Sequence, residues 1–238
     1  MTKFKTIIGA GCLLSCLSFI ACGDNDQSTT DSTTQEEEVD SPTVISNPPR
    51  LKANAQGEHE LLIAYKRQAL YDPETGENDL LQVRGYLTKP ELWNSKNSDG
   101  SVSDVLVGPQ ILAKQGDNLK IHLVNHLPVE STETCPSPVT NINQGNCFNT
   151  TNLHTHGLWV SPQGNSDNVF LSLKPQQDFH YEFKIEPNHP AGTFWYHSHV
   201  HGSTAIQVSS GMAGPLIIEG ERKPVIRQGQ IQQTGDLD

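Results

Sequence analysis

Five of the ten histidines in this chain fall in two short segments where histidine occupies every second position. His154 and His156 form the first segment, and His197, His199 and His201 form the second. Residues two apart on a β-strand project from the same face, so each segment can line one surface with imidazoles. Imidazole is a common ligand for copper, zinc, iron and nickel. One such pair is a weak signal because most strand histidines serve the core or the surface, but two pairs favour a metal site.

The stretches around these histidines indicate short strands. Three aromatic residues, Phe194 to Tyr196, precede the second segment, and aromatic residues suit a pleated, half-buried strand. Gly, Pro, Asn and Asp turns punctuate the rest of the chain, and the turn at 72–76 predicts a hairpin. Short strands without sustained helical periodicity predict an all-β Greek-key sandwich or barrel. Further strands are predicted at residues 59–71, 80–87, 119–125, 169–173, 178–185 and 211–218.

Two other histidines, His122 and His126, lie on or beside the predicted strand 119–125. This strand alternates apolar and polar residues, as expected when one of its faces meets the core. We interpret both histidines as structural or solvated residues and not as metal ligands.

The amino-acid composition and net charge indicate which kinds of molecule the chain can bind. The chain has 238 residues, enough for one ordinary domain with tails. Its 16 basic and 27 acidic residues give a net charge of −11. This balance argues against nucleic acid as a partner, because phosphate binding needs a basic face.

The first 22 residues are typical of an export signal. Two lysines precede an apolar stretch, 6–21, that is too short and too interrupted for a membrane span. Leu17–Cys22 resembles a bacterial lipobox, which predicts cleavage before Cys22 and a lipid on its sulfur. Leu13–Cys16 is a second candidate lipobox, and an ordinary secretory signal with an incidental cysteine is the alternative. We expect an exported protein in the bacterial periplasm or at the cell surface, anchored to a membrane through lipidated Cys22.

Residues 23–49 are predicted to form a disordered acidic tether. They hold seven acids, no Lys or Arg and few apolar residues. Such a segment cannot bury enough apolar surface to offset its ordering entropy. The folded domain is therefore expected at 50–220, and the polar residues 221–238 are expected to be a linker or tail.

Only two of the five cysteines, Cys135 and Cys147, lie in the expected folded domain. An exported compartment permits disulfides, and these two cysteines flank a Pro- and Asn-rich loop that such a bond could close. We therefore predict a disulfide between Cys135 and Cys147. A copper site at either one is disfavoured because neither lies in a His-Cys-His setting.

Several motifs, in order along the chain, now support a family resemblance. Leu153–Gly157 and Gly192–His199 carry the two histidine pairs, Val107–Ile111 and Gly116–Ile121 lie near the start, and Ser210–Glu219 closes the match. Together they resemble the first cupredoxin domain of a multicopper oxidase of the laccase-like kind. The likeness runs from about residue 85 to residue 220. It implies a cupredoxin-like Greek-key fold.

The resemblance also implies a copper centre. In this family electrons from a reducing substrate enter at a type-1 copper and pass to a trinuclear copper cluster, where dioxygen is reduced to water. Carried over by motif, His154 would bind the type-2 copper, and His156, His197 and His199 would bind the type-3 pair. His201 falls just after the matched pair and is expected to be a neighbouring or structural residue.

Two further positions follow from the resemblance. Asp167 stands where family members carry an acid close to the type-2 copper, which implies a proton relay; the alternative is an ordinary loop aspartate. Thr155 replaces the Trp that is usual between the first two histidines. We expect this change to leave ligation intact, because residue 155 should point away from the metal.

The second half of the family's copper ligands has no counterpart here, including the His-Cys-His segment of the type-1 site. The chain is therefore expected to be an N-terminal module with half of the copper ligands, enzymatic only with a second cupredoxin domain or subunit. The polar residues after Gly220 favour this hypothesis. One alternative is a non-enzymatic exported lipoprotein that buffers copper. Another is a zinc hydrolase with a three-histidine site, which the absence of a His-Glu-x-x-His motif disfavours.

Overall fold

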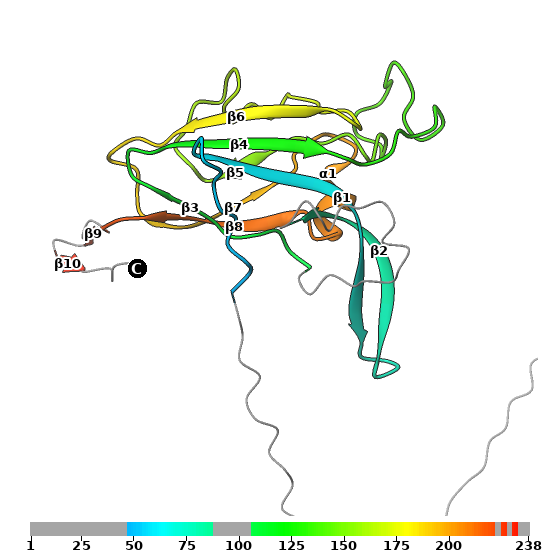
Figure 1. The fold of residues 1–238 in the computed structure, drawn as a ribbon, viewed down its shortest axis with the longest axis horizontal. Helices are drawn as coiled ribbons and strands as arrows, with labels where there is room; N and C mark the ends of the chain where they lie inside the picture. The colour runs from blue at the N-terminus through cyan, green and yellow to red at the C-terminus, as the bar shows by residue number, and fades with distance from the viewer. Residues whose placement is uncertain (1–46, 88–105, 222–224, 228–229, 233–238) are drawn as a thin grey trace, which may run out of the picture. The chain divides into compact units, whose positions relative to one another are not determined.

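Two layers of β-strands lie face to face in the part of the chain that the computed structural model describes, residues 47–87, 106–221, 225–227 and 230–232 (Figure 1). All of these residues belong to one unit, Ile45–Asp238. The predicted signal 1–22 with Cys22, the tether as far as residue 46 and most of the predicted linker 221–238 lie outside the described residues. No helix in the described part has the length and apolar character needed to span a bilayer.

The first layer is a four-stranded sheet with the order β2-β1-β4-β6, and the second has the order β3-β8-β7-β5. A third, two-stranded sheet pairs β10 with β9. The described elements are β1 (Glu58–Asp72), β2 (Glu77–Leu87), β3 (Ile111–Lys114), β4 (Asn118–Asn125), β5 (His154–His156), β6 (Asp178–Lys184), β7 (Gly192–His197), α1 (Thr204–Ser209), β8 (Ala213–Glu219), β9 (Val225–Arg227) and β10 (Gln230–Gln232).

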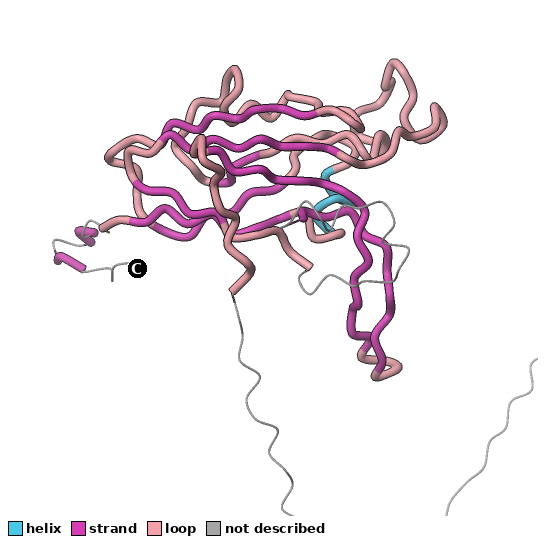
Figure 2. The backbone as a smooth tube through the Cα atoms, viewed as in Figure 1, coloured by secondary structure: helices cyan, strands magenta, loops and turns pink. Residues whose placement is uncertain are grey.

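From β3 to β7 each strand lies in the opposite layer from the strand before it. The pairs β1–β4 and β3–β8 are parallel, whereas β1–β2, β4–β6, β5–β7 and β7–β8 are antiparallel. Strands dominate the backbone in Figure 2, where α1 is the only helix among the described residues. The prediction of an all-β, cupredoxin-like sandwich is confirmed.

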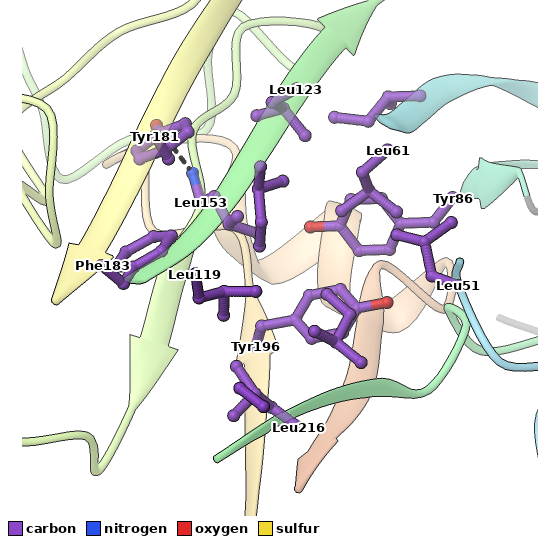
Figure 3. Close-up of a cluster of buried hydrophobic side chains, with 14 of the residues drawn as sticks. Leu51, Leu61, Tyr86, Leu119, Leu123, Leu153, Tyr181, Phe183, Tyr196 and Leu216 are labelled. Carbon is purple, nitrogen blue, oxygen red and sulfur yellow. Dashed lines mark hydrogen bonds between the residues drawn. The ribbon is translucent and has the colours of Figure 1, made fainter. Parts of the chain in front are cut away.

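The core fills the space between the layers because the strands alternate in polarity. On β4, Leu119, Ile121 and Leu123 are buried, while the even-numbered residues face away. Figure 3 shows the core side chains of β4 and β6 meeting Tyr196 of β7 and Leu216 of β8 across this space. Burial of this apolar surface is the main force that holds the two sheets together.

Two expectations about strands are wrong. Residues 169–173 form no strand, and only Leu173 makes an isolated bridge, to Thr151. The Asn152 amide donates to the carbonyls of Val169 and Leu171, so a side chain takes hydrogen bonds that a neighbouring strand would need.

The second histidine segment also does not lie on one strand. β7 ends at His197, so His199 and His201 follow in the turn that leads to α1. Gly202 in this turn has φ +92°, a left-handed conformation that glycine adopts without strain. The three imidazoles therefore cannot share one strand face.

Candidate metal centre

The two histidine segments meet where β5, at the edge of its sheet, pairs with β7. In the antiparallel register His154 lies opposite His197, and His156 lies opposite Trp195. Directly opposed residues project from the same face of a sheet. The pairing of β5 with β7 thus brings the two histidine segments, distant in sequence, onto one surface.

Four imidazoles gather there, and we name His154, His156, His197 and His199 the inner histidine cluster. The ring of His154 lies 5.7, 5.2 and 5.0 Å from the rings of His156, His197 and His199, respectively, measured between centroids. One ligand atom each from His154, His156 and His197 lies within 4.8 Å of the others. His199 is outside this group of three but is next to it. The sequence-based grouping of these four residues therefore corresponds to a spatial cluster.

Two of the rings have a defined tautomer. Nδ1 of His154 lies 2.9 and 3.0 Å from the two carboxylate oxygens of Asp167, and Nδ1 of His197 lies 2.8 Å from the carbonyl oxygen of Ser198. Because these oxygens can only accept, each Nδ1 carries the hydrogen and each neutral ring leaves Nε2 with a lone pair. An imidazole held in this way is typical of a metal ligand.

The nitrogens of His156 and His197 are also close. Nδ1 of His156 lies 3.3 Å from Nε2 of His197. Two nitrogens bound to one tetrahedral metal at about 2.0 Å each are separated by a similar distance, roughly 3.3 Å. The same separation suits a weak hydrogen bond, so this pair fits a metal without requiring one.

Burial also favours the neutral form of His197. The side chain is only 7% exposed, and desolvation is the main cause that lowers its pKa. The neighbouring rings of His154, His156 and His199 lower the pKa further, while the hydrogen bond to Ser198 raises it. The neutral ring is the form that binds a metal.

Buried polar side chains position the backbone around the cluster. The Asn152 carboxamide oxygen accepts the His199 N–H at 2.6 Å, and the Tyr181 hydroxyl accepts the Leu153 N–H at 3.1 Å. Gln207 of α1 donates to the carbonyl oxygens of Phe148 and Thr150, both at 2.8 Å.

The sequence pattern does not single out Asn152, Tyr181 or Gln207, because each looks like an ordinary strand or loop residue. The one usable signal was Asn152, a polar residue two positions before the first histidine. Its amide contacts both the second histidine segment and residues 169–171. These three side chains tie α1, β6 and the loop before β5 to the inner histidine cluster.

Other singled-out residues lie at the margin of the cluster. His201 is exposed, and its ring centroid is 6.3 Å from that of His199. Thr155 is buried and lies opposite Tyr196, between the two ligand candidates of β5. Asp167, besides contacting His154, accepts the Thr155 N–H at 2.8 Å. In the structure Asp167 therefore positions both a ring and the strand that carries it.

Cys135 and Cys147 form a disulfide in the loop that precedes β5. The Cys147 N–H donates to the Thr134 carbonyl, and the Thr150 N–H donates to the Cys147 carbonyl. The bond therefore sits at the base of the segment that carries Phe148 and Thr150, the contacts of Gln207. It supports the cluster from outside and is not part of it.

Comparison with known proteins shows a family likeness for the part of the chain that holds this arrangement. The sequence profile of the multicopper oxidase family matches residues 138–223, which include all four histidines of the cluster. Residues 138–223 are therefore similar to a multicopper oxidase domain. The match begins within the disulfide loop and ends just beyond β8, so it covers the elements that position the cluster.

Curated relatives with similar sequences include multicopper oxidases and laccases. Multicopper oxidase mco of Staphylococcus haemolyticus is 29% identical over 177 residues, which are 73% of this chain and 34% of that protein. Laccase-3 of Trametes villosa is 32% identical over 49% of this chain and 21% of its own length. Copper resistance protein A of Pseudomonas syringae pv. tomato is 29% identical over 51% and 16%, respectively.

The chain spans about a third of the length of the multicopper oxidase mco that it matches. Among solved structures, a laccase-like multicopper oxidase, CueO, from Ochrobactrum sp. is 20% identical, with a TM-score of 0.48. That likeness covers 74% of this chain and 30% of that one.

Proposed function

We propose that the inner histidine cluster binds copper and supplies four ligands to a trinuclear centre, with His154 at the type-2 copper and the other three histidines at the type-3 pair. Copper in such a centre supplies the one-electron steps that reduce dioxygen to water. The chain is then the N-terminal module of an oxidoreductase. The observation that carries this proposal is the convergence of ligand atoms from His154, His156 and His197 within 4.8 Å of one another.

The chain's own residues have separate tasks in this proposal. Asp167 and the Ser198 carbonyl accept the Nδ1 hydrogens of His154 and His197, which orients both rings. Asn152 fixes the backbone of His199. Asp167 is also proposed to relay protons to reduced oxygen, since its carboxylate lies within hydrogen-bond reach of His154.

The other half of the ligands is proposed to come from a second cupredoxin domain or subunit, which would also bring the type-1 copper and the contacts for a reducing substrate. The surface beside the cluster supports this. His156 is exposed, and the neighbouring Trp195 is 38% exposed. His156 stacks on Trp195 with ring centroids 4.8 Å apart. Large aromatic residues at a surface are typical of protein interfaces.

We further propose the domain plan and location expected from the sequence: signal 1–22, lipidation of Cys22, tether 23–49, cupredoxin-like domain 50–220 and linker or tail 221–238. The protein is then exported to the bacterial periplasm or cell surface and held at a membrane. The disulfide between Cys135 and Cys147 supports an oxidising compartment, where such bonds persist.

The test is a titration of the full chain with Cu(II), in which binding is measured by calorimetry or electron paramagnetic resonance. His154→Ala and His197→Ala are expected to weaken copper binding by at least about tenfold, because each removes a direct ligand. His201→Ala is the matched control, since it removes a histidine of the same segment and is expected to keep the parent affinity. Parent-like copper binding in both ligand variants would refute the proposed site.

A further inference from the structure

A second group of histidines lies on the opposite sheet. We name Glu58, Glu60, His122, Asp178 and His180 the outer His–carboxylate cluster. It spans β1, β4 and β6, on the face that points away from the core. Glu60 lies opposite His122, and His122 lies opposite His180, so these three form one row across the sheet. Glu58 and Asp178 lie two residues along β1 and β6 and therefore share the same face.

The contacts show that carboxylates surround both rings. Nε2 of His122 lies 2.8 Å from Oδ2 of Asp178, and Nδ1 of His180 lies 2.7 Å from Oε1 of Glu58. Nδ1 of His122 lies 3.7 Å from Oε2 of Glu60. The two rings are stacked, with centroids 4.1 Å apart and planes 4° apart. The sequence-based interpretation of His122 as solvated or structural leaves this grouping unexplained.

The charge of the cluster favours a cation. Three carboxylates face two imidazoles, so the cluster carries a net charge of about −3 when both rings are neutral. Positive groups on the same face include Lys184 of β6 and Lys120, which lies opposite Glu58 and Glu182 in the row next to the histidines. A dication bound among the histidines would offset most of the remaining negative charge.

We propose that the outer His–carboxylate cluster is a binding site for a divalent first-row cation, Zn²⁺ or Cu²⁺, with His122, His180 and Glu58 as ligands. One ligand atom from each of these residues already lies within 4.8 Å of the other two. Two imidazole nitrogens and a carboxylate oxygen form a donor set that both ions accept. This proposal does not depend on the function proposed for the inner histidine cluster.

Binding requires one local adjustment. Stacked parallel rings direct their nitrogens side by side, so one ring must tilt to aim at a shared ion. The side chain of His180 is 61% exposed and belongs to β6, the last strand of its sheet, so its ring can turn without disturbing the core. The side chain of His122 is only 22% exposed and held by Asp178, which makes it the fixed ligand.

The experiment is a calorimetric titration of the full chain with ZnCl₂, compared with variants at each cluster. His122→Ala and His180→Ala are each expected to weaken one binding event by at least about tenfold, as expected for loss of a direct ligand. The same event is expected to persist in the His154→Ala, His197→Ala double variant. Glu182→Gln, which removes a carboxylate of the same face outside the cluster, is expected to bind Zn²⁺ like the parent.

Ring-proton NMR of the unmutated chain supplies a second measurement that does not rely on variants. Addition of Zn²⁺ is expected to shift the His122 and His180 signals together, at a stoichiometry of one ion for the pair. The proposal is overturned if the two signals do not respond, or if His122→Ala and His180→Ala leave every Zn²⁺-binding event unchanged. Response of only one of the two rings would also overturn it.

Discussion

Asp167 shows how one carboxylate can orient a candidate metal ligand. Both of its oxygens lie within hydrogen-bond distance of His154 Nδ1, and Oδ1 also accepts the Thr155 N–H. The ring and its strand are therefore fixed by the same group. A histidine held in one tautomer loses less freedom when it binds a metal.

Asp167→Ala removes this support, and we expect about a 10- to 100-fold loss of copper affinity at the inner histidine cluster. Asp167→Asn keeps one acceptor oxygen, so its affinity should lie between those of Asp167→Ala and the parent. Asp72→Ala, which removes the carboxylate of the last residue of β1, near the tip of the β1–β2 hairpin, should bind copper like the parent. Copper titration of the three variants measures this order. Equal affinity of Asp167→Ala and the parent would show that Asp167 is an ordinary loop residue.

The sequence predicted the histidines because imidazole at every second position is a local pattern. Asp167 followed only from the family resemblance, and the structure explains its place by contacts with His154 and Thr155. Asn152 and Gln207 could not be predicted, because their partners are distant in the chain and depend on the complete fold. Long-range side-chain contacts of this kind leave no periodic signal.

Lys66 of β1 gives a prediction that depends on pH. Burial lowers the pKa of its ammonium group to about 8, from an ordinary value of 10.5. Between these two values the unfolded chain holds more protons than the folded chain, so the folded state gains stability as pH rises through that window. Relative to Lys66→Met, the parent should gain about 1–2 kcal/mol between pH 8 and pH 10. Urea denaturation of the parent and of Lys66→Met across this range measures the difference. If the free energy of unfolding of the two proteins changes with pH in the same way, Lys66 does not have a lowered pKa.

At the scale of elements, the position of β7 depends on how tightly it packs on β8. Tyr196 is fully buried, its hydroxyl donates to the Pro109 carbonyl at 2.7 Å, and it precedes His197 directly. Gly214 of β8 lies opposite Tyr196. A methyl group at Gly214 would collide with the phenol ring and hydroxyl of Tyr196.

Gly214→Ala is therefore expected to destabilise the domain by about 1–3 kcal/mol, the usual cost of overpacking a core. The displaced Tyr196 should also move His197 and weaken copper binding. Thr193→Ala, at an exposed position of β7, should change the free energy of unfolding by less than about 0.5 kcal/mol. Urea denaturation of both variants tests this, and equal stability would mean that β7 and β8 are less closely packed than described.

The disulfide loop is the second element that supports the site. The bond between Cys135 and Cys147 joins residues 12 apart in the chain. Replacing both cysteines by serine should lower the free energy of unfolding by about 2–3 kcal/mol, mainly by freeing the unfolded chain. Denaturation of the variant and of the parent in reductant should agree. A variant as stable as the oxidised parent would show that the loop is held by its other contacts alone.

The type of fold and most strands were predictable, because alternating polarity and turn residues are local signals. The absence of a strand at 169–173 was not predictable, because it results from capture of two carbonyls by Asn152. Nor was the end of β7 at His197, which separates His199 from the strand. In both cases hydrogen bonds between distant residues override the strand that the local sequence pattern predicts.

On the scale of the whole molecule, the two layers separate two groups of histidines. The inner histidine cluster lies at the β5–β7 edge of one sheet, and the outer His–carboxylate cluster lies on the outward face of the other. A measurement of how many metal ions the chain binds must therefore distinguish the two clusters. The His122→Ala, His180→Ala double variant provides a background in which only the inner cluster is expected to bind.

The most direct test of the central claim is copper stoichiometry and oxygen consumption of the full chain in that background. We predict that the chain binds fewer than three copper ions and that His154→Ala abolishes this binding. No oxygen consumption with a reducing substrate is expected, because only four of the histidine ligands are present. Three tightly bound coppers with oxygen consumption would contradict the half-site and show that the chain completes the centre by self-association. No bound copper, with His154→Ala indistinguishable from its parent, would contradict the metal site itself.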